Sequence, residues 1–200
     1  AIQAGADVLV TSMHKHLTGF TQSSMVLAQG KYLNLERLEA AFEGLHTTSP
    51  SAAILASIDR ARDLLQERGE ELLGNVIGWA EKARRRFRQV PGLGVIGSEI
   101  AARSPALYMH DPSKIVLTLF GTGADGHIVA DVLEQRGIHL EFADRDTFCP
   151  VITLADTEQN IDLMVTEIIR AVEQHRGMPR PMVPIMAWTV KAETAMSPRD

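Results

Sequence analysis

A hydroxyl, an imidazole and an amine stand close together near the start of this chain, in Ser12, His14 and Lys15. They follow residues 7–11, a short apolar run that indicates a strand buried on both faces, as in parallel sheets. Ligands of open α/β sheets bind at the carboxyl ends of strands, so the loop is a candidate site. A lysine there either binds a phosphate as a point charge or forms a Schiff base with a carbonyl compound. A solvated surface lysine is the alternative that these three residues leave open.

Two other features could bind nucleic acid or metal, and the sequence favours a structural role for each. Residues 82–88 are basic, but they end a predicted helix in a chain of net charge −5, which favours a solvated helix end over a nucleic-acid surface. The seven histidines show no metal-ligand spacing, so we predict no metal site.

Three features of the second half of the chain also have structural interpretations. The glycine-rich residues 121–126 lack the Lys-Ser/Thr pair of a P-loop, so we expect a strand-to-helix turn with Asp125 near the N-cap. Glu141 is expected to be a surface carboxylate, with a substrate-facing role as the alternative. Cys149 has no basic neighbour in the sequence and is expected to be a packed thiol.

The elements around the candidate loop follow from apolar spacing. The pattern predicts strands at 7–11 and 24–28, then a helix that begins at Asn34 and ends near Gly44. A long helix is predicted up to Phe87, and it could bend or break at Gly69, Gly74 or Gly78. Its apolar residues recur at helical spacing, at Ile54, Ile58, Ala61, Leu65, Leu72, Val76, Trp79 and Ala83.

After Pro91 the pattern changes to short strands and helices. Strands are predicted at 94–97, 114–120, 138–142 and 147–154, and helices at 125–135 and 160–173. We therefore predict four parts. They are 1–50, the end of an α/β domain; 51–89, a connecting long helix; 90–175, a small α+β domain; and 176–200, a Pro-containing extended tail.

Composition limits the function classes. Of the 200 residues, 45% are hydrophobic and 22% charged, which is typical of a globular protein of one or two domains and excludes long disorder and a membrane span. The single cysteine excludes an internal disulfide and favours a reducing, cytoplasmic location. The acidic balance gives no attraction to nucleic acid or membranes. Because the chain begins at Ala1 without Met, we expect a piece of a longer protein.

Residues 10–24 (VTSMHKHLTGFTQSS) resemble the signature around the pyridoxal phosphate lysine of the bacterial Orn/Lys/Arg decarboxylases, members of the aspartate aminotransferase superfamily. Similar segments recur along nearly the whole chain: HTTSPS at 46–51, ASID at 56–59, DPSK at 111–114, GIHLE at 137–141 and SPR at 197–199. The likeness favours the shorter Gram-positive-type members, which lack an N-terminal response-regulator-like wing.

This resemblance implies a fold and a site. The fold would be α/β, the C-terminal part of a fold-type I large domain for pyridoxal 5'-phosphate (PLP), joined by a long helix to a small α+β domain. Lys15 would carry PLP as a Schiff base and, with His14, be catalytic; Ser12 and His14 would contact the cofactor. Thr47, Thr48 and Ser49 would reach the phosphate in the partner subunit's site.

Two observations leave alternatives open for that last segment. Ser49 and its neighbours could simply cap the long helix, and this role is compatible with phosphate binding. Ala52 stands where relatives often carry an aromatic residue, so the packing around the substrate channel, and with it the substrate's size, stays open.

The implied reaction is decarboxylation of a basic amino acid (arginine, lysine or ornithine) to an amine and CO2. The implied enzyme is a cytoplasmic homodimer or higher homo-oligomer of polyamine biosynthesis, with shared active sites. PLP also needs a carboxylate at its pyridinium nitrogen. Relatives carry it in an Asp-x-Ala-His stretch upstream of the position of Ala1, and Asp7 is misplaced to substitute, so we expect the chain alone to be inactive. The alternatives are another fold-type I reaction (an aminotransferase or a lyase) and a non-catalytic paralogue or fragment serving dimerisation.

Overall fold

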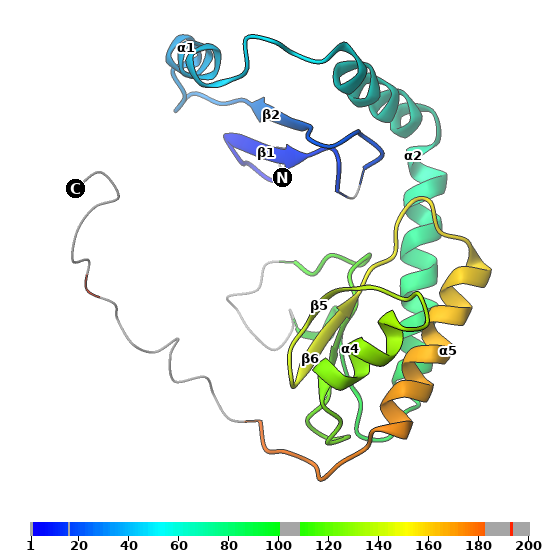
Figure 1. The fold of residues 1–200 in the computed structure, drawn as a ribbon. Coiled ribbons are helices and arrows are strands. Elements are labelled where there is room, and N and C mark those ends of the chain that lie inside the picture. Colours follow the sequence, from blue (N-terminus) through cyan, green and yellow to red (C-terminus); the bar gives the residue numbers. More distant parts are fainter. Residues whose placement is uncertain (1, 16, 101–108, 183–192, 194–200) are drawn as a thin grey trace. The chain divides into compact units, whose positions relative to one another are not determined.

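The computed structural model describes residues 2–15, 17–100, 109–182 and 193 (Figure 1). The chain forms two compact units. The first unit comprises residues 1–81 and 152–158, and the second unit comprises 82–151 and 159–200. Both contain helices and strands, so the predicted mixed α/β class is confirmed. Within the described ranges, no helix is long and apolar enough to cross a membrane.

The first unit begins with a hairpin. Strand β1 (Val8–Ser12) pairs antiparallel with β2 (Ser24–Ala28), with Val10 opposite Val26. Helix α1 (Leu35–Leu45) follows, and it begins as predicted at Asn34, whose side-chain oxygen accepts a hydrogen bond from the Arg37 amide at 2.9 Å.

The predicted burial of β1 on both faces is wrong for this chain. Val8 and Val10 share one face of the strand, and Val10 is 67% exposed. A short apolar run does not specify which way a strand is paired. Here the connection of residues 13–23 returns the chain beside β1, and its described residues include no crossover helix, which a parallel partner usually needs.

Helix α2 (Ala52–Phe87) runs for 36 residues without a break at Gly69, Gly74 or Gly78. A glycine inside a helix costs about 1 kcal/mol relative to alanine. Ion pairs between residues three apart lie before and around Gly69, for example Arg62 with Asp59 at 2.9 Å and Arg68 with Glu71 at 2.8 Å. The C-terminal end of the helix also packs into a core, where Ala83 and Phe87 are buried. The weak points are therefore spanned.

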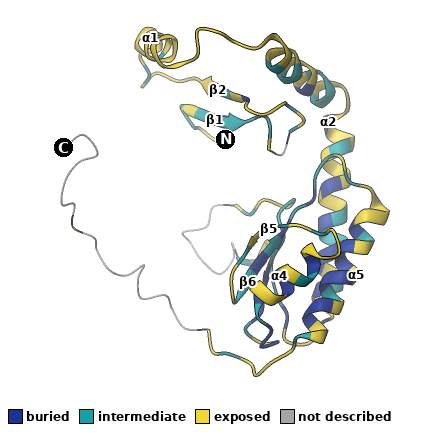
Figure 2. Cartoon of the chain, in the orientation of Figure 1, coloured by how far each residue is buried: buried dark blue, intermediate teal, exposed yellow. Residues whose placement is uncertain are grey.

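The second unit is a four-stranded antiparallel sheet with helices. The strand order is β3 (Gly94–Ile96), β4 (Val116–Thr118), β6 (Thr147–Pro150), β5 (Leu140–Ala143). Helices α4 (Gly126–Glu134) and α5 (Glu158–Gln174) complete it. Figure 2 shows buried residues gathered on these helices, the sheet and the end of α2. The fully buried side chains include Phe87, Leu117, Leu119, Val129, Leu133, Phe148, Val165, Ile168 and Val172.

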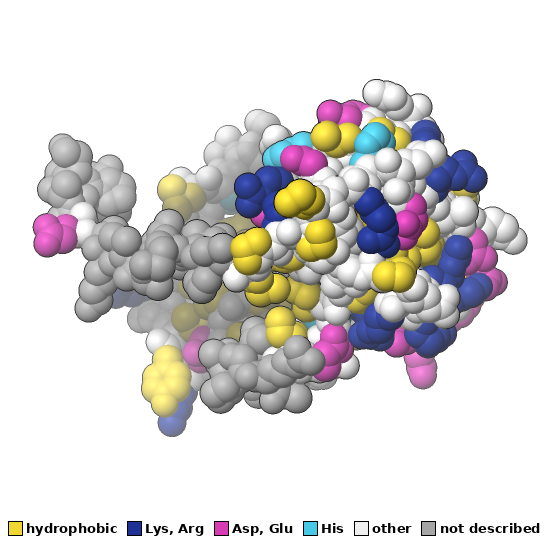
Figure 3. All heavy atoms as spheres, turned by 90° about the horizontal axis from the view of Figure 1, so that it is seen from below, with side chains coloured by type: hydrophobic (Ala, Val, Ile, Leu, Met, Phe, Trp, Pro, Cys, Tyr) yellow, Lys and Arg dark blue, Asp and Glu magenta, His cyan; other side chains and the backbone are white. Residues whose placement is uncertain are grey.

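In the basic run at the end of α2, Arg85 and Arg88 are exposed as predicted, but Arg84 is not solvated. Arg84 is only 2% exposed, and its guanidinium donates hydrogen bonds to the carbonyls of Pro112 and of Lys114, the latter at 2.7 Å. Arg84 and Phe87 are three residues apart and therefore share the helix face that packs on the core. A buried guanidinium is tolerated there because backbone carbonyls replace the water that it loses. On the face in Figure 3, basic and acidic side chains interleave.

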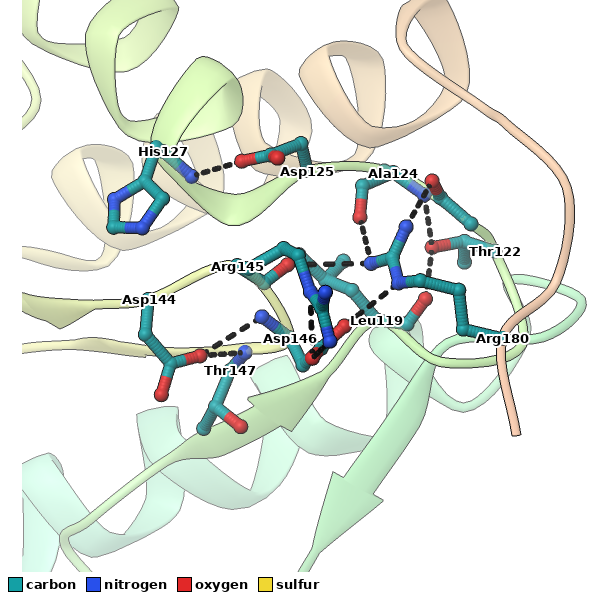
Figure 4. A network of polar contacts seen from close by, with 11 residues as sticks. Leu119, Thr122, Ala124, Asp125, His127, Asp144, Arg145, Asp146, Thr147 and Arg180 are labelled. Atoms are coloured by element: carbon teal, nitrogen blue, oxygen red, sulfur yellow. Dashed lines mark hydrogen bonds and ion pairs between the residues drawn. The ribbon is translucent and has the colours of Figure 1, made fainter. Parts of the chain in front are cut away.

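The turn before α4 confirms the prediction for residues 121–126, since Asp125 Oδ1 accepts a hydrogen bond from the His127 amide at 2.9 Å. Arg180 then holds this turn from the far end of the sequence (Figure 4). Its Nε lies 2.7 Å from Asp146 Oδ1, Nη1 donates to Gly123 O at 2.6 Å, and Nη2 donates to Ala124 O at 2.5 Å. One guanidinium thus links three segments of the second unit.

Replacing Arg180 by alanine is expected to destabilise the second unit by about 2 kcal/mol at pH 7, because a charged donor to a carboxylate and two carbonyls is lost. The pKa of Asp146 is lowered, first by its hydrogen bond from Arg145 and then by Arg180. The stability gained through a lowered carboxyl pKa is present above the ordinary pKa of about 3.9 and is lost as the pH falls through the lowered pKa. Urea titrations at several pH values should therefore show the difference between the two proteins narrowing below about pH 4, down to the part that the two carbonyl hydrogen bonds contribute. Arg68→Ala, at an exposed ion pair with Glu71, is the control and should change little.

Candidate functional site

The candidate lysine lies in the loop of residues 13–23 that joins β1 to β2, hereafter the lysine loop. Met13 at its start is buried, and the Met13 amide donates to Ser23 O at 3.0 Å, which closes the loop at its base. The Gly19 amide donates back to Met13 O at 2.9 Å. Lys15 itself is exposed. The backbone on either side of the amine is therefore fixed, while the amine stays accessible to a ligand.

His14 is held by the same end of the loop. Its Nδ1 lies 2.6 Å from Ser23 O and 3.0 Å from Ser23 N. A protonated Nδ1 donates to the carbonyl and an unprotonated one accepts from the amide, so the Ser23 backbone occupies Nδ1 in either state. Nε2 is the ring nitrogen left for a ligand. His14 is half-buried, which limits how the ring can turn.

Ser12 is the last residue of β1 and lies directly opposite Ser24 of β2. Opposite residues of an antiparallel pair project from the same face, so two hydroxyl-bearing residues end the hairpin beside the lysine loop. The structure therefore brings Ser12, His14 and Lys15 to one end of one hairpin. This is the cluster that the sequence predicts.

Ser57 ties the lysine loop to helix α2, and sequence reasoning gave it no role. The Phe20 amide donates to Ser57 Oγ at 2.8 Å, and the hydroxyl donates in turn to Ile54 O at 2.7 Å. The only sequence signal was that Ser57 belongs to a segment resembling the family, which does not reveal a contact between residues 37 positions apart.

Thr47, Thr48 and Ser49 lie between α1 and α2 and are all exposed. The Thr47 hydroxyl accepts the Ser49 amide at 3.2 Å, which is a local turn. No hydrogen bond or ion pair within the described ranges joins this segment to residues 12–15. The first backbone hydrogen bond of α2 runs from Leu55 N to Ser51 O at 3.0 Å, so the helix starts after Ser51. The role that the resemblance gives to residues 47–49 stays a prediction.

Asp7 lies beyond the far end of β1 from Lys15. The five residues of the strand span about 17 Å of extended chain. The backbone carbonyl of Asp7 accepts a hydrogen bond from Gln29 N at 2.8 Å, which fixes it at the opposite end of the hairpin. Asp7 is thus placed away from the lysine loop, in agreement with the sequence.

In the second unit, Glu141 pairs with Lys114 at 3.2 Å beside a cavity of about 300 Å³ that Cys149 also lines. Burial raises the pKa of the Cys149 thiol, and the Glu141 carboxylate raises it further. A raised pKa disfavours the thiolate, and Cys149 is half-buried, so the packed thiol stays the expectation for this residue. No group of three His, Cys, Asp or Glu in the part of the chain that the structure describes could hold a metal ion.

Solved structures show the class of fold. A Pseudomonas aeruginosa lysine decarboxylase A matches with a TM-score of 0.67 and 24% identity over 82% of this chain and 28% of its own. A NifS-like protein matches with a TM-score of 0.63 and 13% identity over 85% of this chain and 47% of its own. The chain therefore shares the mixed α/β fold of these structures, which is the fold-type I class.

The sequence comparisons show the family. The family model described as "Orn/Lys/Arg decarboxylase, major domain" matches residues 2–160, which is most of the chain. The chain therefore belongs to the Orn/Lys/Arg decarboxylase family. Arginine decarboxylase of Halalkalibacterium halodurans is 33% identical over the whole chain and 41% of the relative's length. Arginine decarboxylase of Bacillus subtilis is 33% identical over 94% of the chain and 40% of its own length. The chain thus spans about two fifths of these relatives.

Proposed function

We propose that this chain carries the cofactor lysine of a PLP-dependent decarboxylase, which converts a basic amino acid to an amine and CO2. The observation that carries the proposal is the lysine loop. An accessible amine lies between backbone positions fixed by hydrogen bonds, at the end of β1, inside the segment that matches the family. The curated relatives named arginine decarboxylase favour arginine as the first substrate to test.

The residues of this loop fit PLP, which presents an aldehyde and a phosphate. The Lys15 amine is accessible to an aldehyde, since its side chain is exposed. Ser12 supplies a hydroxyl, and His14 supplies Nε2, as partners for polar groups of the cofactor. PLP, when bound, would act as the electron sink for the bond that breaks at Cα.

The chain's own residues have distinct tasks in this proposal. Lys15 would hold the cofactor through its amine, and its Nζ would be the group able to carry a proton at the substrate Cα. The Ser23 backbone fixes Nδ1 of His14, so the ring presents Nε2 in one orientation. The buried Met13 and the Gly19 amide keep the backbone on both sides of Lys15 in place.

The proposal also includes the location, the assembly and the domain organisation of the enzyme. The enzyme would be a cytoplasmic homodimer or larger homo-oligomer, in which Thr47, Thr48 and Ser49 reach the partner subunit's phosphate site. Their exposure leaves their hydroxyls accessible for such a contact. We also keep the division into residues 1–50, 51–89, 90–175 and 176–200 as a proposed domain organisation.

Product analysis tests the proposed function. The complete gene product is first loaded with PLP. Carboxyl-labelled L-arginine, L-lysine and L-ornithine are then added, each in a separate reaction. We expect labelled CO2 and the matching amine in equal amounts from at least one of them. A keto acid would instead indicate an aminotransferase, and ammonia would indicate an elimination lyase. No product from any basic amino acid would leave only the non-catalytic role in dimerisation.

A further inference from the structure

The lysine loop has two sets of ties with different effects. The inner ties join Met13, His14, Gly19 and Ser23 to one another, so they fix the shape of the loop. The outer tie joins the Phe20 amide to Ser57 Oγ on the second turn of α2, so it fixes where the loop lies along that helix. Both ties belong to the first unit.

The inner ties leave little room for the loop to deform. A Cβ added to Gly19 would come 2.8 Å from Ser23 Oγ and 2.9 Å from Met13 O, closer than such atoms approach in proteins. Met13 and Ser23 are 2% and 4% exposed, so neither can move aside into solvent. The close contacts among Met13, Gly19 and Ser23 couple the two ends of the loop to each other. Phe20 follows Gly19 directly, so a displacement at Phe20 is carried to Lys15.

The Ser57 hydroxyl is well suited to hold Phe20. It accepts one hydrogen bond from the Phe20 amide and donates one to Ile54 O, so it cannot turn without losing a partner. Ile54 lies in the first turn of α2, immediately after the segment that contains Thr47 and Ser49. Ser57 therefore connects the loop that bears the lysine with the start of the helix that follows the hydroxyl-rich segment.

From these contacts we infer that Ser57 is a positioning residue for Lys15, a role that rests on the proposed function. Ser57 sets the place of the lysine loop relative to α2, and thereby the place of the Lys15 amine relative to an aldehyde bound nearby. It does not touch the reacting atoms. Displacements of an ångström at a reacting group cost up to about a hundredfold in rate. Loss of one outer tie is expected to cost about tenfold.

The test measures how fast Lys15 captures PLP in the complete gene product. Lys15 Nζ condenses with the PLP aldehyde with loss of one water, and borohydride then supplies hydride to the C=N bond, which fixes the cofactor for mass analysis of the Lys15 peptide. We expect Ser57→Ala to slow trapping about tenfold and Ser57→Thr, which retains the hydroxyl, to restore it to near the wild-type rate. Gly19→Ala deforms the inner ties and should slow trapping as well. Ser113→Ala removes a hydroxyl bonded to Asp111 in the second unit and should have no effect.

A second readout separates positioning from loss of structure. Acylation of Lys15 by a small amine-reactive acylating reagent, without PLP, reports only how accessible the amine is. The exposed amine should react equally in wild type and Ser57→Ala. Equal trapping by wild type and Ser57→Ala overturns the inference and leaves the proposed function intact. So does a loss of acylation that matches the loss of trapping, because it shows that the loop has changed shape and that the Lys15 amine is no longer accessible. If wild type itself traps no PLP on Lys15, the proposed function fails and this inference fails with it.

Discussion

Replacing Lys15 by alanine is expected to abolish covalent capture of PLP and to lower the decarboxylation rate by at least about a thousandfold. The methyl group of alanine cannot condense with an aldehyde or carry a proton at Cα, and general acid–base groups alone contribute about 10²–10⁴-fold. The substitution leaves the fold intact, because the Lys15 side chain is exposed and the ties of the lysine loop run through neighbouring residues. The measurements are the absorbance of the PLP-bound protein, the mass of the borohydride-reduced peptide and labelled CO2 release.

Lys31→Ala provides the matched control for this prediction. Lys31 is another exposed lysine of the first unit, and its ammonium lies 5.2 Å from the ring centre of Tyr32. Its loss should leave capture and decarboxylation unchanged. Covalent PLP retained at a single lysine in Lys15→Ala would show that the cofactor lysine lies elsewhere. The free energies of unfolding of both variants should agree with that of wild type within about 0.5 kcal/mol, as for most exposed substitutions.

Elements with a strong local signal are predictable from this sequence. Asn34 and Asp125 act as helix caps as expected, because a short polar side chain before a helix satisfies amides only a few residues away. Helix α2 does not break at Gly69, Gly74 or Gly78, where the sequence allowed a break. Their cost of about 1 kcal/mol each is opposed by ion pairs between residues 59 and 71 and by the core contacts of Ala83 and Phe87.

The misjudged residues depend on contacts distant in sequence. Arg84 looks like part of a solvated basic run until the chain returns Pro112 and Lys114 to its guanidinium. Val10 looks buried from its apolar neighbours in the sequence, yet the described residues leave its face of β1 exposed. The burial of a strand face and the partners of a buried charge are set by tertiary structure, and apolar spacing does not predict them.

The same distinction applies to the site. Ser12, His14 and Lys15 are contiguous enough for the sequence to reveal them as a group. Ser23 and Ser57 hold that group in place through contacts across 9 and 37 positions, and nothing in their local sequence marks them. Residues that do chemistry are recognisable by type, whereas residues that place them are recognisable only by geometry.

Replacing Phe148 by alanine is expected to destabilise the second unit by about 3–5 kcal/mol, the usual cost of removing a fully buried aromatic ring. Phe148 is 0% exposed in β6, between Leu117 of β4 and Ala143 of β5. Its loss leaves a cavity at the centre of the sheet, where strands on both sides limit collapse. Phe142→Ala on neighbouring β5 is the control, because that ring is 50% exposed and its removal should cost under about 1 kcal/mol. The measurement is the urea midpoint followed by far-UV circular dichroism. Equal losses in the two variants would contradict the core described for this unit, whereas a loss confined to Phe148→Ala places its centre at the β4–β6 pair.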